Sequence, residues 1–243
     1  MTPAPLKSVA AVVLASRGGA RLGRALDSVA WAAERIVLDP GGRTGAEPLP
    51  DDVRRGGDPT EVASAPWLLL LEEHETVSRP LAAAIAAAVE RPAATAYRIP
   101  QEVTAFGVTL RPRRAPVRLA CRSDARLALR SGLALELAFD GPGAPRLSEP
   151  LLTNGAPTLA AAVEDLDAQA TTLAVLLHAR RVRPRLRHLV VPPLVAGARA
   201  LAARSARGGF WGRWTLAVLG GYRVLVAYAK LWEMRRDEAA RPR

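Results

Sequence analysis

A strand, a helix and a second strand follow one another within the first forty residues, and this succession restricts the possible folds more than any other feature. Residues 8–15 are apolar and rich in β-branched side chains, which predicts a strand buried on both faces. Apolar residues then recur at three- and four-residue spacing over residues 20–33, as on one face of a helix, and residues 35–39 predict the second strand. A strand–helix–strand unit of this length requires a parallel sheet.

Apolar and alanine-rich segments extend this pattern along the chain. Residues 67–71 predict a strongly buried strand, and residues 79–90 predict a helix with Pro80 in its first turn. Weaker patterns predict strands of a second, antiparallel part and one long amphipathic helix. These segments are residues 96–100, 117–121 and 133–139 for the strands and 158–182 for the helix. The expected fold class is therefore α/β, with a Rossmann-like, mostly parallel sheet flanked by helices and a small antiparallel part.

The last part of the chain predicts a separate helical region. Three prolines predict a linker before it: Pro184, Pro192 and Pro193. Residues 208–234 are apolar and aromatic, but cations interrupt them, so no uncharged run reaches the roughly 18–20 residues of a transmembrane helix. Two interpretations stay open: an amphipathic helix lying in a membrane interface, or a core-packing helix whose cations reach solvent. We expect one domain over residues 1–157 and a helical, basic region over residues 158–243.

The charge of the chain is concentrated at its C-terminal end. The 243 residues carry a formal net charge of +11, and residues 176–243 contain 15 basic but only three acidic residues. Such a basic region favours an anionic partner, namely a membrane surface, a glycolipid or a nucleic acid. No helix-turn-helix, zinc-finger or RNA-recognition pattern accompanies the charge, so we expect no nucleic-acid partner. A single cysteine, Cys121, excludes a disulfide scaffold and a multi-cysteine metal site.

Candidate functional residues follow the predicted parallel strands. Ligands of open α/β sheets bind at the carboxyl ends of the strands, and three such ends carry polar groups: residues 16–19, Asp39 and residues 72–75. Asp39 precedes Pro-Gly-Gly, so it can form a turn or accept hydrogen bonds from a ribose. The cluster Glu72-Glu73-His74-Glu75 can hold a divalent cation with a diphosphate, or can be a solvated turn before a helix.

The order of these segments resembles family 2 glycosyltransferases, in particular the branch of lipopolysaccharide-core glucosyltransferases. The sequence Leu26-Asp27-Ser28-Val29-Ala30-Trp31-Ala32 is similar to the Leu-Glu-Ser-Val-x-Trp-Ala of that branch. Residues 35–41 resemble its Ile-Val-Val-Asp-Ser-Gly, and residues 67–75 resemble Trp-Val-Leu-x-Leu-Asp-Ala-Asp-Glu. Residues 118–122 look like Arg-Leu-Phe-x-Arg, and residues 228–233 resemble the C-terminal end of the family.

The resemblance implies a GT-A-type domain that transfers a sugar, with inversion, from a nucleotide-sugar donor linked to UDP. It implies nucleotide-sugar contacts from five residues: Ser16, Arg17, Asp39, Glu72 and Glu73. The aspartate pair that binds Mn²⁺ or Mg²⁺ in the family falls on Glu72 and His74, and the imidazole nitrogen should weaken the binding of Mg²⁺. Glu136, with Asp140 behind it, is the candidate catalytic base for the acceptor hydroxyl.

Together these features predict a glycosyltransferase of the cell envelope. The acceptor would be a glycolipid or polysaccharide, as in lipopolysaccharide biosynthesis. The basic, aromatic end of the chain would hold the enzyme at an anionic membrane surface, in the cytoplasm on the inner face of the cytoplasmic membrane. The alternative is a catalytically degenerate relative with a binding or assembly role, since the first turn lacks the family's acidic and amide residues and the aspartate pair is altered.

Overall fold

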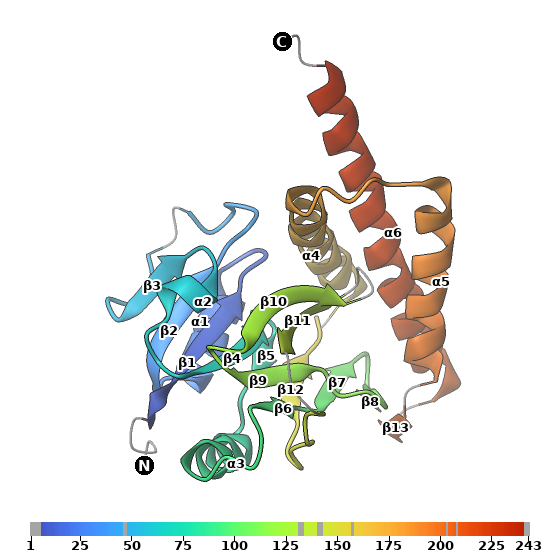
Figure 1. Cartoon of the computed structure of the whole chain (residues 1–243). Coiled ribbons are helices and arrows are strands. Elements are labelled where there is room, and N and C mark those ends of the chain that lie inside the picture. Colours follow the sequence, from blue (N-terminus) through green and yellow to red (C-terminus); the bar gives the residue numbers. More distant parts are fainter. Residues whose placement is uncertain are drawn as a thin grey trace. The chain divides into compact units, whose positions relative to one another are not determined.

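The computed structural model divides the chain into two compact units. The sheet unit consists of the residues up to Val103 together with residues 113–130 and 134–154, and the helical unit consists of Thr104–Pro112 and the chain from Gly155 onward. Figure 1 colours the elements along the sequence. The residues that the structure describes are 6–45, 48–130, 134–139, 143–156, 158–202, 204–207 and 209–240.

A six-stranded mixed sheet forms the centre of the sheet unit, with the order β3-β2-β1-β4-β9-β6. The first four of these strands pair in parallel. Their bounds are Val53–Gly56 for β3, Ala32–Leu38 for β2, Leu6–Leu14 for β1 and Trp67–Glu72 for β4. The remaining two are β9 (Val117–Cys121) and β6 (Ala96–Arg98), and β9 runs antiparallel to both of its neighbours. The expected α/β class is thereby confirmed with a mixed sheet, and the mostly parallel, Rossmann-like layout of a GT-A domain stays a prediction.

The position of β9 corrects one expectation. Residues 96–100 and 117–121 were expected in a separate antiparallel part, but β6 and β9 extend the central sheet. The physical reason lies in the burial of β9, whose residues from Val117 to Ala120 are all buried. A strand covered on both faces belongs inside a layered sheet, where its apolar side chains find partners on either side.

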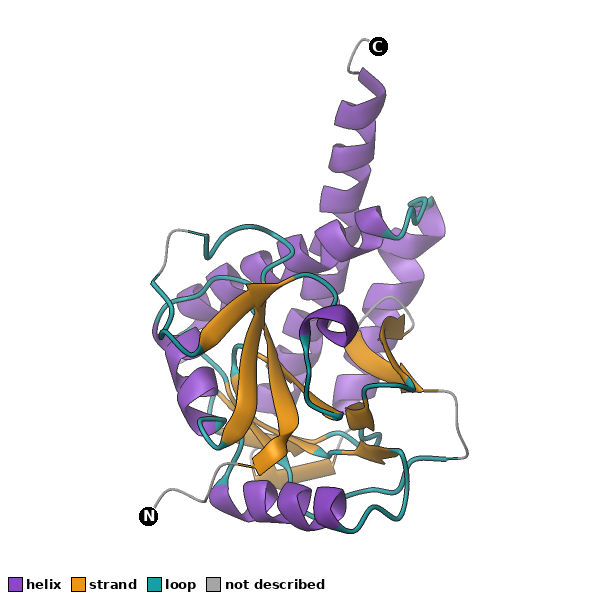
Figure 2. Ribbon diagram, turned by 60° about the vertical axis from the view of Figure 1, so that its left-hand side comes forward, coloured by secondary structure: helices purple, strands orange, loops and turns teal. Residues whose placement is uncertain are grey.

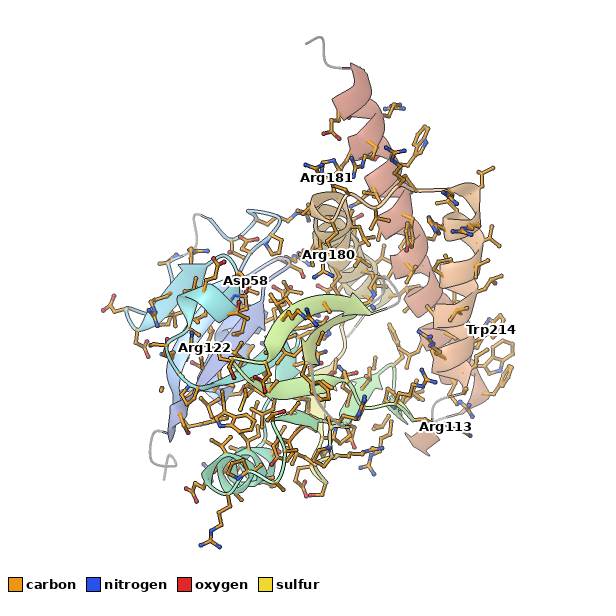
Figure 3. All side chains as sticks on the ribbon, in the orientation of Figure 1. Asp58, Arg113, Arg122, Arg180, Arg181 and Trp214 are labelled. Carbon is orange, nitrogen blue, oxygen red and sulfur yellow. The ribbon has the colours of Figure 1, made fainter. Side chains whose placement is uncertain are left out.

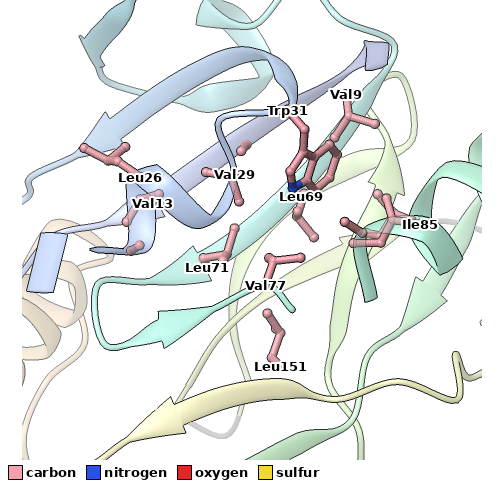
Figure 4. Packing of buried hydrophobic residues seen from close by; sticks show 14 of the residues in the cluster. Val9, Val13, Leu26, Val29, Trp31, Leu69, Leu71, Val77, Ile85 and Leu151 are labelled. Carbon is pink, nitrogen blue, oxygen red and sulfur yellow. The ribbon is translucent and has the colours of Figure 1, made fainter. Parts of the chain in front are cut away.

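Two helices pack on one face of the central sheet and complete the core in Figure 4. Helix α1 (Ala20–Ser28) buries Leu22 and Leu26, and α3 (Arg79–Glu90) buries Leu81 and Ile85. These side chains form one cluster with alternate residues of the strands, among them Val9, Ala11, Val13, Leu69 and Leu71. The predicted helix over 79–90 is confirmed, and the side-chain oxygen of Ser78 caps it by accepting a hydrogen bond from the backbone N–H of Leu81.

Shorter elements complete the sheet unit. Strand β5 (Glu75–Thr76) pairs with β12 (Leu151–Asn154), and β10 (Ala125–Arg130) forms an antiparallel pair with β11 (Ala134–Phe139). The connecting segment before β4 contains the single-turn helix α2 (Pro59–Val62). Strand β7 (Gln101–Ala105) runs across the boundary of the two units in the chain. The predicted strand at residues 133–139 thus corresponds to β11.

Three helices dominate the helical unit, drawn in purple in Figure 2. Helix α6 (Phe210–Ala240) packs against α4 (Leu159–Ala179) and α5 (Leu186–Leu201). A short pair of strands, β8 (Val108–Arg111) and β13 (Arg204–Arg207), accompanies them. The predicted helices over 158–182 and 208–234 are confirmed with shifted ends. No helix among the described residues is long and apolar enough to span a membrane.

The expected proline linker is correct at Pro184, which lies between α4 and α5, but wrong at Pro192 and Pro193, which lie inside α5. A proline in a helix interior removes a backbone hydrogen bond and crowds the preceding turn. Helix α6 passes close to α5 at the same place: a Cβ atom added to Gly221 of α6 would lie 3.0 Å from the carbonyl oxygen of Pro193. The backbones of α5 and α6 therefore lie close together at the proline pair.

Candidate functional site

The carboxyl ends of β2, β1 and β4 lie side by side at one edge of the central sheet. Leu14, the last residue of β1, is in register with Leu38 of β2 and with Glu72 of β4. The ladder continues one step further, because the backbone N–H of Ala15 donates to Leu38 (2.8 Å) and that of Glu73 donates to Leu14 (3.0 Å). The segments that follow these strands, which contain all but one of the predicted site residues, therefore share one edge.

Glu73 holds the turn that follows β1. Its carboxylate accepts hydrogen bonds from three successive backbone N–H groups, those of Ser16 (2.8 Å), Arg17 (3.0 Å to the same oxygen) and Gly18 (3.0 Å). Successive N–H groups that point to one place form an anion-binding concavity, and here a buried side chain of the protein itself is the anion. Gly18 and Gly19 follow with positive φ angles of 81° and 71°, which favour glycine. Ser16, Arg17 and Glu73 are thus brought together in contact with one another, and their contact with a nucleotide-sugar stays a prediction.

Asp39 organises the loop after β2. One carboxylate oxygen accepts from the backbone N–H of Arg43 (3.1 Å), and the other accepts from the backbone N–H (2.7 Å) and the hydroxyl (2.6 Å) of Thr44. The hydroxyl oxygen of Thr44 in turn accepts a hydrogen bond from Arg55 (2.7 Å). The turn-forming interpretation of Asp39 is therefore confirmed by geometry, whereas its contact with a ribose stays a prediction.

A buried ion cluster lies directly behind the end of β4. One guanidinium nitrogen of Arg118, in β9, lies 3.2 Å from a carboxylate oxygen of Glu72 and 3.1 Å from one of Glu75. The side chain of Arg118 is 1% exposed and that of Glu75 is fully buried. Glu75 also accepts a hydrogen bond from the backbone N–H of Glu72 (2.8 Å) and one from the side chain of Gln101. Buried carboxylates are stable only when they are paired in this way.

Arg118 is a residue of the candidate site to which the sequence assigned no role. The resemblance includes it in a motif, but no partner for it was predicted. The signal was available, because Arg118 interrupts an otherwise apolar strand at residues 117–121 and a buried cation needs a buried anion. The acidic cluster at residues 72–75 follows another buried strand, so it could have been identified from the sequence as the source of that anion.

The residues predicted to bind a metal form a poor site for Mg²⁺ or Mn²⁺. His74 lies beside Glu72, with 3.6 Å between its Nε2 atom and a carboxylate oxygen. Among the described residues, no group of three or more histidine, cysteine, aspartate or glutamate side chains is arranged to hold a metal ion. The guanidinium of Arg118 pairs with both Glu72 and Glu75, so a dication at Glu72 would lie near a fixed positive charge. Two donors, one of them nitrogen, do not fit a hard cation that prefers six oxygen ligands.

The predicted catalytic base lies on another strand of the sheet unit. Glu136 belongs to β11, where its backbone is paired with Ala128 of β10. The side chain of Glu136 and the whole of Asp140 lie outside the described residues. The role of Glu136 stays a prediction.

Comparison with known proteins adds no assignment to this geometry. No model of a protein family matches the chain, and no curated protein matches it significantly in sequence. The motifs and the edge of the sheet described above are therefore the features that indicate a function.

Proposed function

We propose that the chain is a glycosyltransferase of the family 2 type. It binds a nucleotide-sugar at the sheet edge and transfers the sugar, with inversion, to a cell-envelope glycan or glycolipid. One observation carries the proposal: the turn at Ser16–Gly18, Asp39 and the Glu72–Glu75 segment follow three adjacent parallel strands and meet at one edge. Ligands of open α/β sheets bind outside such carboxyl ends.

The chemistry of the edge suits a nucleoside diphosphate bound through arginine. The exposed side chain of Arg17 presents a guanidinium at the turn whose backbone N–H groups are held by Glu73. The loop organised by Asp39 would contact the uridine. Because the guanidinium of Arg118 already pairs with Glu72, we expect donor binding to depend little on Mn²⁺ or Mg²⁺. Glu136 would accept the proton of the acceptor hydroxyl.

A second candidate function is a degenerate relative that keeps the fold and serves as a binding or assembly partner. The observation that favours it is the carboxylate of Glu73, which occupies the three amides that a phosphate would use. The carboxylate of Asp39 is likewise occupied by its own loop. In this alternative the edge is closed by internal anions and takes no nucleotide.

Isothermal titration with UDP-glucose and UDP, with and without Mn²⁺, tests the enzyme proposal. We expect saturable binding at millimolar or lower concentration, with a similar dissociation constant in both buffers. Absence of binding at millimolar concentration would contradict it. Strong dependence on Mn²⁺ would instead support the metal predicted at Glu72 and His74 and would contradict the role given to Arg118.

The variant Glu73→Gln separates the two candidates, with Glu90→Gln on the exposed end of α3 as a matched control. For an active enzyme, the native chain binds the donor and Glu73→Gln weakens binding, because the turn at residues 16–18 loses its anchor. For a degenerate relative, the native chain binds no nucleotide and removal of the internal charge permits UDP to bind. The control should match the native chain in both cases.

A further inference from the structure

One face of α6 presents large apolar side chains to solvent. These residues form what we call the α6 stripe: Trp211, Trp214, Val218, Tyr222, Leu225 and Trp232, exposed by 39% to 77%. With 100° of rotation per residue they fall within an arc of about 80°, so they occupy a single face. Figure 3 shows the ring of Trp214 projecting outward from the helix. A contiguous exposed apolar face of this kind marks an interaction surface.

The other faces of α6 already have partners within the helical unit. Val224, Ala227 and Leu231 are buried. Lys230 pairs with Asp167 of α4 and donates a hydrogen bond to the hydroxyl of Thr171 (2.7 Å). The α6 stripe is therefore not the face with which α6 packs onto the rest of the unit. Each interpretation of the sequence pattern describes one side of α6: one face packs in the core, and the other stays exposed.

Helix α5 approaches α6 at a glycine and leaves several large apolar side chains exposed. No residue of α5 is buried, and Leu186, Val190, Val191 and Leu194 are exposed by 54% to 84%. The contact with α6 uses glycine instead: a Cβ atom added to Gly197 would lie 3.2 Å from the carbonyl oxygen of Ala217. Small residues at the helix interface and large apolar residues outside are typical of helices that lie against lipid.

The charge around this surface specifies the partner. No acidic residue occurs between Asp167 and Glu233, whereas eleven basic residues do. Several of them lie exposed just before α5 or in its first turn: Arg181, Arg183, Arg185 and Arg187. Uniform positive charge opposes contact with a second copy of the same surface. It favours an anionic surface that also accepts tryptophan and leucine, which is the interface of a membrane with acidic headgroups.

We propose that the α6 stripe and the exposed face of α5 together dock on an anionic lipid bilayer without crossing it. The tryptophans and leucines enter the headgroup region, and the arginines before α5 contact the acidic lipids. This surface lies entirely within the helical unit and does not depend on the glycosyltransferase proposal.

Vesicle sedimentation tests the proposal with the full chain. Vesicles of phosphatidylcholine with about 30% phosphatidylglycerol should bind the protein, and raising the salt to about 0.5 M should weaken binding because it screens the arginines. Pure phosphatidylcholine should bind it much less. Tryptophan fluorescence should be quenched by brominated anionic lipid. Lack of binding to the acidic vesicles would overturn the proposal.

Matched variants identify the surface. The triple variant Leu194→Ser, Trp211→Ser and Trp214→Ser should lower the partition coefficient at least tenfold, and Arg183→Glu with Arg187→Glu should do so on acidic vesicles. The control Leu159→Ser with Val163→Ser removes exposed apolar side chains of α4 and should leave binding unchanged. Equal loss in the control would contradict the assignment. Self-association in analytical ultracentrifugation that the triple variant abolishes, without vesicle binding, would assign the face to a protein contact instead.

Discussion

The edge of the central sheet and the outer face of α5 and α6 differ in whether their side chains have partners within the protein. At the edge, carboxylates that could serve a ligand are held by the protein itself: Glu73 by three amides, Asp39 by its loop and Glu75 by Arg118. On the helices, apolar side chains that could form a core stay in solvent. Internal contacts at the sheet edge contribute to stability, whereas the exposed apolar side chains of α5 and α6 are available for contact with a partner. Substitutions at the first should therefore affect folding, and those at the second should affect association.

The largest effect is expected from Arg118→Met. This change leaves Glu75 as a fully buried charge without its cation, and breaking a buried pair costs about 3–5 kcal/mol. Urea unfolding followed by circular dichroism should give this decrease in the free energy of unfolding. Arg24→Met, on the exposed side of α1, is the control and should change stability by less than about 0.5 kcal/mol. Adding Glu75→Gln should restore part of the loss, and an additive double variant would contradict the pairing.

Glu73→Ala should have the next largest effect. It leaves three backbone N–H groups without their charged acceptor, which we expect to lower the free energy of unfolding by about 2–3 kcal/mol. Hydrogen exchange should accelerate at the amides of residues 16–18 and remain slow in β4. If those amides stay protected, Glu73 is not the group that holds the turn.

Gly221→Ala tests the crossing of α5 and α6. The added Cβ atom would lie 3.0 Å from the carbonyl oxygen of Pro193, so the helices must separate slightly. Overpacking of this kind costs about 1–3 kcal/mol, and alanine's better helix propensity places the expected loss near the lower limit. Gly220→Ala, whose Cβ would meet nothing within 4 Å, is the neighbouring control and should stabilise the helix. A gain in melting temperature for both variants would contradict the close crossing.

The smallest effect concerns pH and the first turn of α5. The backbone N–H of Arg185 donates to Nδ1 of His188 (3.1 Å), which requires a neutral ring at that atom. Partial burial, followed by the charges of Arg187 and Arg185, lowers the pKa of His188 below its ordinary value of 6.5. The folded state then binds fewer protons than the unfolded state. The contribution of His188 to the free energy of unfolding is therefore complete above pH 6.5 and declines as pH falls toward the lowered pKa.

Nuclear magnetic resonance provides the measurement. The ring of His188 should titrate below pH 6.5, and amide exchange at the start of α5, corrected for its intrinsic pH dependence, should increase in the same range. The variant His188→Gln should remove this pH dependence. Persistence of the same profile in the variant would assign the effect to another group.

Local patterns in the chain were sufficient for much of the sheet unit. The periodicity of residues 8–39 predicted β1, α1 and β2, and Pro80 marked the first turn of α3. The residues expected at one sheet edge do meet there, because parallel strands that follow βα crossovers end on the same side. These features depend on neighbours a few positions apart, so they can be seen in the sequence.

Contacts between distant residues decided the remaining features. The pairing of Arg118 with Glu75, the capture of the Ser16–Gly18 amides by Glu73 and the inclusion of Pro192 and Pro193 in a helix follow from packing across the fold. Residue types alone predicted charges, a turn and a chain break at these positions. Burial changes the free energy of each group by more than its secondary-structure propensity does. An unpaired polar group in the interior costs more free energy than a residue with poor helix propensity. That difference is why the partners of these residues appear only in the tertiary structure.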